Sequence, residues 1–485
     1  METIPVTQKP TRRRLLGAGA LVLLTALAGA AARGTNPTAV APPPAKTAQF
    51  TAPGNGTVSF TGQLDRSAVQ VGGDGLVRME LVLSAANGPE RGVRRVPTDL
   101  LVVLDHSGSM AGEKLEYARL AIHELVSQLG PEDRFALITY SDGAELSIPL
   151  GLAAPETRQG WLATVDRIGP AGGTNMSSGL DLALENVLRL RAAGRAPRVI
   201  LISDGLANQG DATPEGLVGR AKRAAQAELA LSTVGVGADF NEYLMTQLAD
   251  AGGGNYYYVE RGTELAPVFA REFGAARATV ASAVAVEITP ADGVRVVDAA
   301  GYPLEQSGGR VIVRPGTLFG GQERRIWVTL AVPHDAPADH ALGRFALSFK
   351  EGETARTLAF DQTPQVACVG SPEEFFAAVD VPAWERSVAV EGFNKMQDEV
   401  ARQVKAGRRE EARAAMDAFR RDAGRMNERL KSPAVQQKLD ALGEMDREVA
   451  GAFVGSEPEQ KSKQNALSKD RAAAAYDLRR PGSKY

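Results

Sequence analysis

The feature that most constrains the fold is an apolar run that ends in a polar loop. Leu100 to Leu104 are all aliphatic and are followed directly by Asp105-His106-Ser107-Gly108-Ser109-Met110. A continuous run of this length predicts a strand buried on both faces, as in a parallel sheet covered by helices. The polar residues then lie at the carboxyl end of the strand, where open α/β sheets present their ligand crevice. Because Asp105, Ser107 and Ser109 alternate along the chain, we expect their side chains to point the same way.

Two later stretches add oxygen donors to this predicted edge. Gly169 to Asn175 is a glycine-rich loop that brings the hydroxyl of Thr174 to the start of a helix, and Arg198 to Ser203 is a second apolar strand that ends at Asp204-Gly205. Carboxylates and hydroxyls are hard ligands that suit Mg²⁺ or Mn²⁺. Zn²⁺ is disfavoured because no cysteine and no suitably spaced histidine accompanies them.

In this order, Asp105, Ser107, Ser109, Thr174 and Asp204 resemble the metal-ion-dependent adhesion site of von Willebrand factor type A domains. That pattern is Asp-x-Ser-x-Ser, then a Thr in a loop, then an Asp-Gly after a strand. The resemblance implies a bound Mg²⁺ or Mn²⁺ and, as an external ligand, an Asp or Glu carboxylate of a protein partner. It extends over residues 98–275, where strands and helices alternate, and implies an α/β fold with a doubly wound, mostly parallel sheet.

Two other functions fit the same residues less well. One is a metal-dependent hydrolase or phosphatase with Asp105 as nucleophile. No lysine, histidine or second acidic pair lies in the neighbouring strand-end loops to act as acid or base, and the alternation points His106 away from Asp105. We therefore predict that the chain is not an enzyme. The other is a structural envelope protein whose ion only holds loops together, and the sequence leaves this alternative open.

The N-terminus has the pattern of an export signal. Arg12-Arg13-Arg14 precedes an uncharged run from Leu15 to Ala32 that is rich in Leu, Ala and Gly. Residues 1–32 are therefore expected to be a signal peptide, with a resemblance to twin-arginine signals, that directs the protein to the periplasm or cell envelope. The alternative is an uncleaved anchor in the inner membrane, although the Ala and Gly content makes it a weak span. Residues 33–56 are rich in Pro, Ala and Gly and are expected to be a linker.

Short β patterns occur on both sides of the α/β region. Residues 57–97 and 276–370 contain strand-like alternation separated by Gly and Pro turns. The few strands before residue 97 cannot form a stable domain alone. We therefore predict that residues 98–275 are inserted between two parts of one β-sandwich.

The C-terminal part of the chain is predicted to be helical. In residues 383–455 apolar residues recur at helical spacing between short breaks, which predicts antiparallel helices packed as a bundle. Residues 456–485 are charged and small and are expected to form a flexible tail, with a short docked helix from Ala472 to Leu478 as the alternative. The single cysteine, Cys368, excludes an internal disulfide, and a net charge of −3 gives no reason to expect a nucleic acid or an anionic membrane surface as partner.

Overall fold

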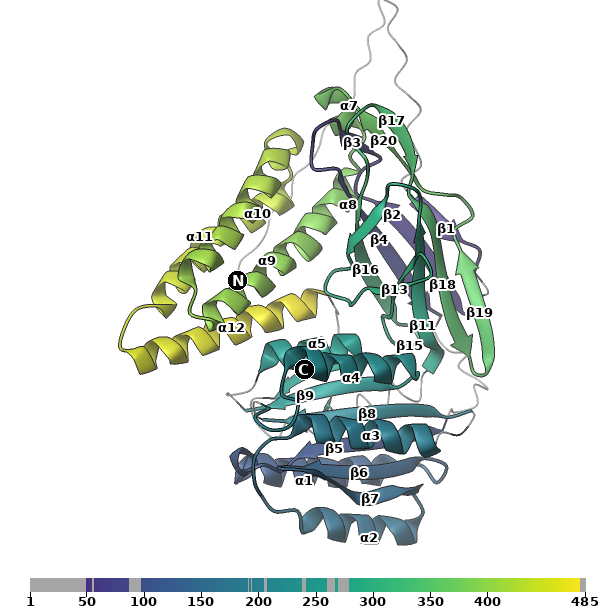
Figure 1. Cartoon of the computed structure of the whole chain (residues 1–485), viewed down its shortest axis with the longest axis vertical. Coiled ribbons are helices and arrows are strands. Elements are labelled where there is room, and N and C mark those ends of the chain that lie inside the picture. The colour runs from purple at the N-terminus through teal and green to yellow at the C-terminus, as the bar shows by residue number, and fades with distance from the viewer. Residues whose placement is uncertain are drawn as a thin grey trace, which may run out of the picture. The chain divides into compact units, whose positions relative to one another are not determined.

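The computed structural model describes residues 49–479, except 55, 87–96, 191, 193, 205–206, 238–240, 260–266 and 269–278 (Figure 1). The predicted signal or anchor, residues 1–32, lies outside the described residues, as does most of the predicted linker. Within the described part of the chain, no helix combines the length and apolarity that a membrane span requires.

Residues 98–259 form an α/β domain around a six-stranded sheet of order β10-β9-β8-β5-β6-β7. Neighbouring strands are parallel except for β7, which runs antiparallel to β6 at one edge. The elements, in chain order, are β5 (Thr98–Asp105), η1 (Gly108–Met110), α1 (Glu113–Gln128), β6 (Arg134–Tyr140), β7 (Ala144–Leu152), α2 (Pro155–Asp166), α3 (Met176–Leu190), β8 (Ala196–Ser203), α4 (Pro214–Gln226), β9 (Ala230–Val236), α5 (Glu242–Ala251) and β10 (Gly253–Val259).

The central strand β5 is buried along its whole length. Leu100, Val102 and Leu104 belong to a core that includes residues of α1 and α2. Leu101 and Val103 belong to a second core, on the other face, that includes residues of α3, α4 and α5. Helices on both faces explain why the strand is continuously apolar instead of alternating. The predicted doubly wound, mostly parallel sheet is confirmed.

Two antiparallel sheets form the β-sandwich. The first contains β1 (Gln49–Ala52), β2 (Val58–Leu64), β4 (Leu76–Ala85), β16 (Glu323–Ala331) and β12 (Arg295–Asp298). The second contains β13 (Glu305–Ser307), β14 (Arg310–Val313), β11 (Thr279–Pro290), β18 (Gly343–Glu351) and β19 (Thr354–Ala359), with β15 (Leu318–Phe319) paired to β11. A small third sheet contains β17 (Ala338–Ala341), β20 (Gln365–Val369) and β3 (Ala68–Gln70).

One strand pair shows that the α/β domain is inserted into the sandwich. β4 precedes the α/β domain and β16 follows it, yet they pair along nearly their whole length, with Met79 opposite Val328. Met79 and Val328 belong to the sandwich core, whereas Glu80 and Trp327, which also oppose each other, lie outside that core. The predicted insertion of an α/β domain between sandwich strands is therefore confirmed.

The range predicted as a linker contains a strand at its end. β1 pairs with β2, and its alternate residues Phe50 and Ala52 are buried in the sandwich core. The ring of Phe50 stacks on Phe360, with 5.8 Å between ring centroids. The strand is short and is followed by Pro53-Gly54, so the composition of the surrounding chain hid its alternation.

The C-terminal region is helical. Its elements are α7 (Pro372–Ala377), α8 (Val381–Arg386), η3 (Ser387–Gly392), α9 (Phe393–Lys405), α10 (Arg409–Leu430), α11 (Pro433–Ala452) and α12 (Glu457–Arg479). α8, η3 and α9 are continuous, and η3 is a π-helical turn within them. α9, α10 and α11 share an apolar core, in agreement with the predicted bundle.

The prediction of a flexible tail is wrong for residues 457–479. These residues form α12, which packs against α9. Ser468, Ala472 and Ala475 are buried, and the Ser468 hydroxyl donates a hydrogen bond of 3.0 Å to Oε1 of Glu242 on α5. The buried stripe consists of small residues among many charged ones, so it lacks the large apolar side chains from which a packed helix is normally predicted.

Candidate metal site at the edge of the α/β sheet

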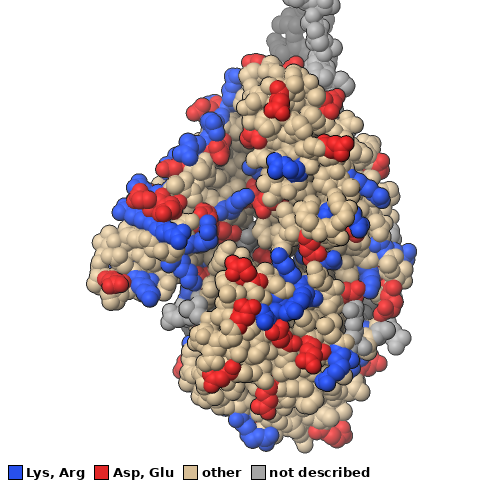
Figure 2. Space-filling view, in the orientation of Figure 1, with Lys and Arg blue, Asp and Glu red and all other residues tan. Residues whose placement is uncertain are grey.

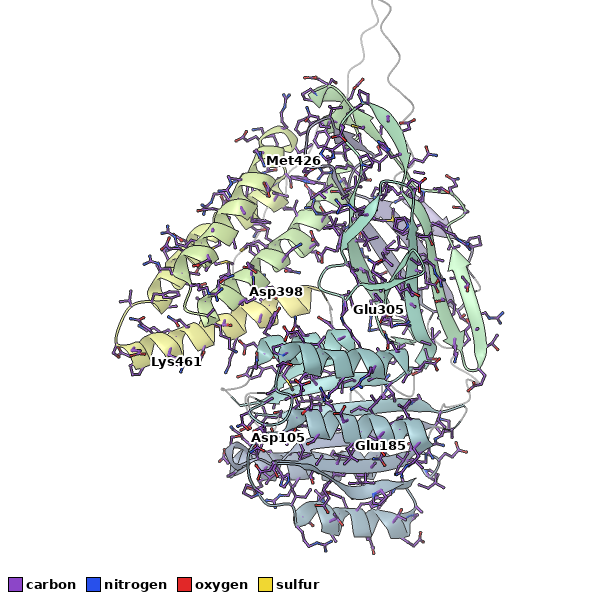
Figure 3. The ribbon with its side chains drawn as sticks, in the orientation of Figure 1. Asp105, Glu185, Glu305, Asp398, Met426 and Lys461 are labelled. Carbon is purple, nitrogen blue, oxygen red and sulfur yellow. The ribbon has the colours of Figure 1, made fainter. Side chains whose placement is uncertain are left out.

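Asp105, the last residue of β5, is buried and fully hydrogen-bonded. Figure 3 labels it at the end of the α/β sheet where β5 finishes. Its Oδ1 accepts a hydrogen bond from the backbone N–H of Ser107 at 2.9 Å. Its Oδ2 accepts from the hydroxyl of Ser203 at 2.7 Å and from the hydroxyl of Tyr140 at 3.3 Å. Three donors from three chain segments therefore hold this carboxylate in place without any bound ligand.

Ser107 and Ser109 connect Asp105 to the next strand end. The two hydroxyl oxygens lie 3.1 Å apart, and the Ser109 hydroxyl donates to Oδ1 of Asp204 at 2.8 Å. Ser109 is exposed, whereas Ser107 and Asp204 are buried. The other oxygen of Asp204, Oδ2, accepts a hydrogen bond from the ammonium of Lys114 in the first turn of α1. Asp105, Ser107, Ser109 and Asp204 therefore form one connected cluster.

Thr174 lies in a loop that backbone contacts join to this cluster. Gly108 N donates to Gly172 O at 3.1 Å, and Ala171 N donates to His106 O at 2.8 Å. Thr174 is buried, and its backbone N–H donates to Oδ1 of Asn208 at 2.9 Å. The loop of Thr174 is thus held against both the Asp-x-Ser-x-Ser segment and the segment that follows Asp204.

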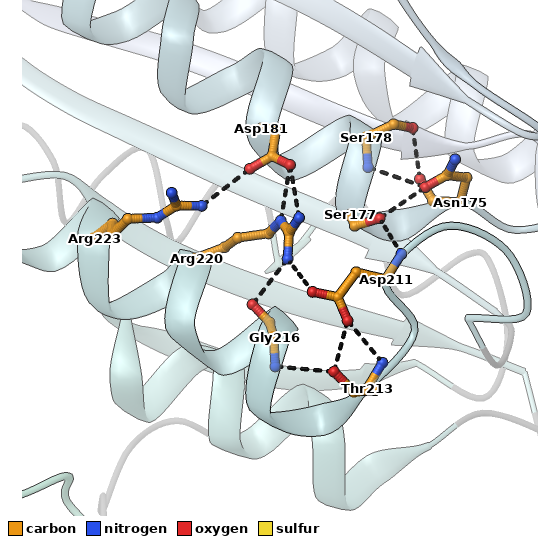
Figure 4. Close-up of polar contacts among 9 residues, drawn as sticks. All are labelled: Asn175, Ser177, Ser178, Asp181, Asp211, Thr213, Gly216, Arg220 and Arg223. Carbon is orange, nitrogen blue, oxygen red and sulfur yellow. Dashed lines mark hydrogen bonds and ion pairs between the residues drawn. The ribbon is translucent and has the colours of Figure 1, made fainter.

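Next to Thr174, a polar network joins the start of α3 to the loop before α4 (Figure 4). The side chain of Asn175 accepts hydrogen bonds from Ser178 N at 3.1 Å and from the hydroxyl of Ser177 at 2.8 Å. That hydroxyl also accepts a hydrogen bond from Asp211 N at 3.1 Å. Arg220 of α4 then pairs with Asp211 at 2.8 Å. These contacts fix the course of the chain from Thr174 into α3, which begins at Met176.

Burial changes the acid–base properties of the site. Burial raises the pKa of the Asp105 carboxyl above its ordinary value, and the nearby charge of Asp204 adds to this, while hydrogen bonds from Ser107 and Ser203 oppose it. Burial and the charge of Asp105 raise the pKa of Tyr140 well above its ordinary value, so the phenol stays protonated and donates to Asp105. A divalent cation here would relieve the repulsion between the two carboxylates.

The structure places the predicted residues as follows. Asp105, Ser107, Ser109 and Asp204 are in direct contact, and Thr174 is brought to them by its loop. Sequence reasoning missed Lys114, Ser203 and Tyr140, and the search for a lysine in the strand-end loops did not include Lys114, which reaches the site from the first turn of α1. A usable signal exists for Ser203 alone, since it directly precedes Asp204 and lies at the end of β8.

The donor set fits a small divalent cation. In an octahedral Mg²⁺ site with bonds of about 2.1 Å, adjacent oxygen ligands lie about 3 Å apart. The spacing from Ser107 Oγ to Ser109 Oγ is 3.1 Å and that from Ser109 Oγ to Asp204 Oδ1 is 2.8 Å. Among the described residues, no cluster of three or more His, Cys, Asp or Glu side chains is arranged to hold a metal. A metal at this edge would therefore depend on hydroxyl oxygens as well as carboxylates.

Comparison with known proteins identifies the domain that carries this site. Residues 99–271 match the family model described as von Willebrand factor type A domain. The chain contains a type A domain. Such domains are typically modules for protein–protein interaction, and the catalytic alternatives find no support among these similarities.

Two bacterial proteins match different shares of this chain. The uncharacterized protein YfbK of Escherichia coli is 30% identical over 193 residues, which is 39% of this chain and 33% of YfbK. The chain thus matches about one third of the length of that relative. The uncharacterized protein sll0103 of Synechocystis is 25% identical over 332 residues, which is 66% of this chain and 77% of that protein.

A solved structure shares the wider architecture. The structure titled von Willebrand factor type A from Catenulispora acidiphila superimposes with a TM-score of 0.61 at 16% identity. The match covers 87% of this chain and 96% of that one, so it extends well beyond the type A domain. At this identity the similarity shows the fold alone.

Proposed function

We propose that this protein binds an acidic residue of a protein partner through a Mg²⁺ or Mn²⁺ ion at the edge of its type A sheet. The ion would be held by Asp105, Ser107, Ser109, Thr174 and Asp204. The observation that carries the proposal is the connected cluster from Asp105 to Asp204. Within it the oxygens of Ser107, Ser109 and Asp204 have the spacing of adjacent octahedral ligands.

The hydrogen bonding of Asp105 supports an ion that keeps a net attraction for anions. Both oxygens of Asp105 already accept hydrogen bonds, so this carboxylate is better placed to act through water than as a direct ligand. The hydroxyls of Ser107 and Ser109 are neutral donors, and Ser109 is exposed. An ion bound mainly by neutral oxygens retains positive charge and attracts an external carboxylate.

The same contacts argue against the hydrolase alternative. A nucleophilic carboxylate must present an oxygen to its substrate. Asp105 is 0% exposed, and its oxygens face Ser107 N, Ser203 and Tyr140. Lys114 is directed at Asp204 and lies within the cluster as a counter-charge. The alternative of a purely structural ion is separated from partner binding by the experiments below.

The proposal includes export to the periplasm or cell envelope. It is supported by the Arg12-Arg13-Arg14 segment before the uncharged run of residues 15–32. Sequencing the N-terminus of protein purified from the envelope fraction tests it, and we expect the mature chain to begin after Ala30 or Ala32. An intact Met1 on membrane-bound protein would indicate the uncleaved anchor instead. An intact Met1 on soluble cytoplasmic protein would contradict export.

Metal binding is tested first, with the metal alone. We expect calorimetric titration of the metal-free protein with Mg²⁺ and Mn²⁺ to give one site, and Ser109→Ala to weaken it by at least about tenfold through loss of one ligand. Ser127→Ala is the matched control, because Ser127 is an exposed serine at the other end of α1. Equal affinities in the wild type and Ser109→Ala would contradict the site.

Partner binding is tested with envelope proteins. The wild type, Ser109→Ala and Ser127→Ala are used to capture envelope proteins with Mg²⁺ and with excess chelator. A partner of the proposed kind is retained by the wild type and Ser127→Ala with Mg²⁺, and is lost with chelator or Ser109→Ala. Changing its critical Asp or Glu to Asn or Gln should abolish capture. A site that binds metal but gives no metal-dependent capture indicates a structural ion.

A further inference from the structure

A cavity of about 390 Å³ lies between the β-sandwich and the C-terminal helices. Its floor is the outer face of the first sheet, including Trp327 of β16, together with Tyr302 from the loop after β12. Its roof is η3 and the start of α9, including Val390 and Asn394. We call it the sandwich–helix cavity. It has the size of small-molecule sites, is lined chiefly by apolar atoms, and is separate from the metal site. Figure 3 labels Asp398, which lines it on α9, well apart from Asp105.

The charged residues on the floor of the sandwich–helix cavity are paired with one another. Glu80 accepts hydrogen bonds from Arg325 at 2.8 Å and from Arg386 at 3.0 Å. Arg386 also donates to the side chain of Gln63 at 2.9 Å. These groups therefore need no charged ligand to satisfy them.

Two charged residues of the roof, Glu391 and Lys395, are paired as well. Glu391 accepts a hydrogen bond from Arg78 at 3.1 Å, and Lys395 pairs with Asp298 at 3.3 Å. The face drawn in Figure 2 likewise mixes acidic and basic side chains without a continuous field of one sign. The electrostatics of the cavity therefore favour a neutral occupant.

Asn394 is the exception to this pairing. It is 1% exposed and lines the sandwich–helix cavity, and neither Oδ1 nor Nδ2 of its amide has a hydrogen-bond partner in the described structure. A buried amide without partners costs free energy, so such groups are rare unless a water or ligand satisfies them. The amide has one acceptor and two donors, and a ligand with a matching donor–acceptor edge can pair with both atoms once the side chain, which is buried as it stands, turns toward the cavity.

The backbone above the cavity is irregular at the same place. Val390 and Glu391 belong to the π-helical turn η3, which interrupts the continuous helix and ends at Gly392, two residues before Asn394. Such turns interrupt α-helices mostly as single turns and often lie at functional sites. Here the π-helical turn contributes to the roof that Asn394 completes.

We propose that the sandwich–helix cavity binds a small neutral molecule with an apolar, planar body and a carboxamide-like edge. The apolar body lies along Trp327, Tyr302 and Val390, and the edge pairs with both atoms of the Asn394 amide. The chemical class includes primary amides, lactams and uracil-like rings. This activity is independent of metal-dependent partner binding.

The test compares probes of one shape that differ only in the polar edge. The full chain is titrated with 2-naphthamide, with 2-acetylnaphthalene (an acceptor only) and with 2-naphthoate (a charged edge). We expect 2-naphthamide to bind best, with 2-naphthoate weaker by at least about tenfold because the cavity offers no unpaired cation. Asn394→Leu should weaken 2-naphthamide by about tenfold and should weaken 2-acetylnaphthalene by only about threefold, because the ketone can pair with Nδ2 alone.

Protein stability supplies a second readout that separates a ligand site from a packing role. Asn394→Leu replaces an unpaired amide by an apolar group, so the unliganded variant should have a higher Tm than the wild type. The matched control is Asn427→Leu, because the buried amide of Asn427 accepts from Ser432 N at 2.7 Å and donates to Gln436 at 3.3 Å. This control should lower Tm and leave 2-naphthamide binding unchanged.

Three outcomes would overturn the proposal: no binding of 2-naphthamide at its solubility limit, equal binding of the amide and the carboxylate, or undiminished amide binding by Asn394→Leu. The first would leave water as the occupant of the cavity, and each of the other two would show that the amide of Asn394 does not select the occupant. Ser109→Ala should bind 2-naphthamide like the wild type, so failure of the metal site and failure of this proposal are distinguishable.

Discussion

The ammonium of Lys114 donates a hydrogen bond to Oδ2 of Asp204, the carboxylate that also accepts from Ser109. It donates in addition to the backbone carbonyl of Ser109 at 3.2 Å. A cation of this protein thus contacts the same residues that we propose hold a divalent metal. Lys114 and the metal therefore compete for the charge of Asp204, and binding of a metal must weaken or replace the contact of Lys114.

Removing the charge of Lys114 should strengthen metal binding. We expect Lys114→Met, which keeps most of the side-chain length, to raise the Mn²⁺ affinity of the full chain by about tenfold. The reason is that the metal no longer displaces a charge-assisted hydrogen bond, which contributes about 1.5 kcal/mol. The measurement is calorimetric titration of the metal-free protein.

The control for this prediction is Lys461→Met. Lys461 is an exposed residue of α12, outside the type A domain, and its change should leave the Mn²⁺ affinity within about twofold of the wild type. A Lys114→Met variant that binds Mn²⁺ no better than the wild type would mean that Lys114 does not compete with the metal.

The predictable part of the metal site is the part that is local in sequence. Asp105, Ser107 and Ser109 lie within five residues at the end of one apolar run, so their proximity follows from strand geometry. The contact of Lys114 with Asp204 joins residues 90 positions apart through a flexible side chain. The spacing of apolar and polar residues along the sequence does not predict such a contact. In the sequence, Ser203 is only the last residue of a predicted buried strand. In the structure its hydroxyl donates a hydrogen bond to Asp105.

The buried carboxyl of Glu391 should make stability depend on pH. Burial is the main cause and raises the pKa of Glu391. The positive charges of Arg78 and Lys395 lower this pKa, and the negative charges of Asp298 and Asp65 raise it. A raised pKa in the folded state means that this contribution to stability is complete below the pKa of the unfolded chain. It is lost as pH rises through the folded pKa. We expect the unfolding free energy of the wild type, relative to Glu391→Gln, to fall as pH rises above the ordinary pKa of a glutamate carboxyl, about 4.3.

Glu399 on the same helix provides a control of opposite sign. Burial alone would raise its pKa, but hydrogen bonds from Arg402 and Gln403 lower it below its ordinary value. Its contribution is therefore present above the unfolded pKa and is lost as pH falls through the folded pKa. Urea unfolding of the wild type, Glu391→Gln and Glu399→Gln should then give differences of opposite slope, for Glu399 below the ordinary pKa of a glutamate carboxyl and for Glu391 above it. Slopes of the same sign would show that the burial of Glu391 does not set its pKa.

Packing of α12 predicts that its small residues cannot be enlarged. Ala475 is 0% exposed, and α12 packs against α9. Ala475→Leu should lower the free energy of unfolding by about 1–3 kcal/mol, because extra methyl groups in a packed interface force side chains and backbone to shift. Ala466→Leu, at an exposed position of α12, is the control and should change it by less than about 0.5 kcal/mol. Equal midpoints in urea for the two variants would indicate that α12 is not docked in solution.

The fold was predictable where apolar residues are large and regularly spaced. The run in β5 and the alternation of Val77, Met79, Leu81 and Leu83 in β4 predicted a buried parallel strand and a sandwich strand, and all four of these β4 residues lie in the sandwich core. Most of α12 was missed because its contact surface is made of Ser and Ala, and only residues 472–478 were considered as a possible docked helix. Asn394 was not predictable either, since a polar residue in an amphipathic helix normally faces solvent, and only the tertiary structure shows it buried.

The loop of Thr174 should depend on glycine at one position and not at another. Gly172 has φ +59°, and a Cβ there would lie 2.4 Å from Oδ2 of Asp142. That carboxylate accepts hydrogen bonds from Gly173 N and from Gln209 Nε2, both at 2.7 Å. Gly172→Ala therefore adds backbone strain of about 1–2 kcal/mol and moves Asp142 away from the loop that it holds.

We expect Gly172→Ala to weaken Mn²⁺ binding by about tenfold, because displacement of the loop moves Thr174 relative to Ser109. Asp142 lies outside the proposed ligand set, so the loss would act through position alone. Gly169→Ala is the control, since a Cβ at Gly169 meets no described atom within 4 Å and its φ is not positive. That variant should bind Mn²⁺ like the wild type. If both variants bind Mn²⁺ with wild-type affinity, the position of Thr174 does not limit the metal site, and the ion would rest on Ser107, Ser109 and the two carboxylates.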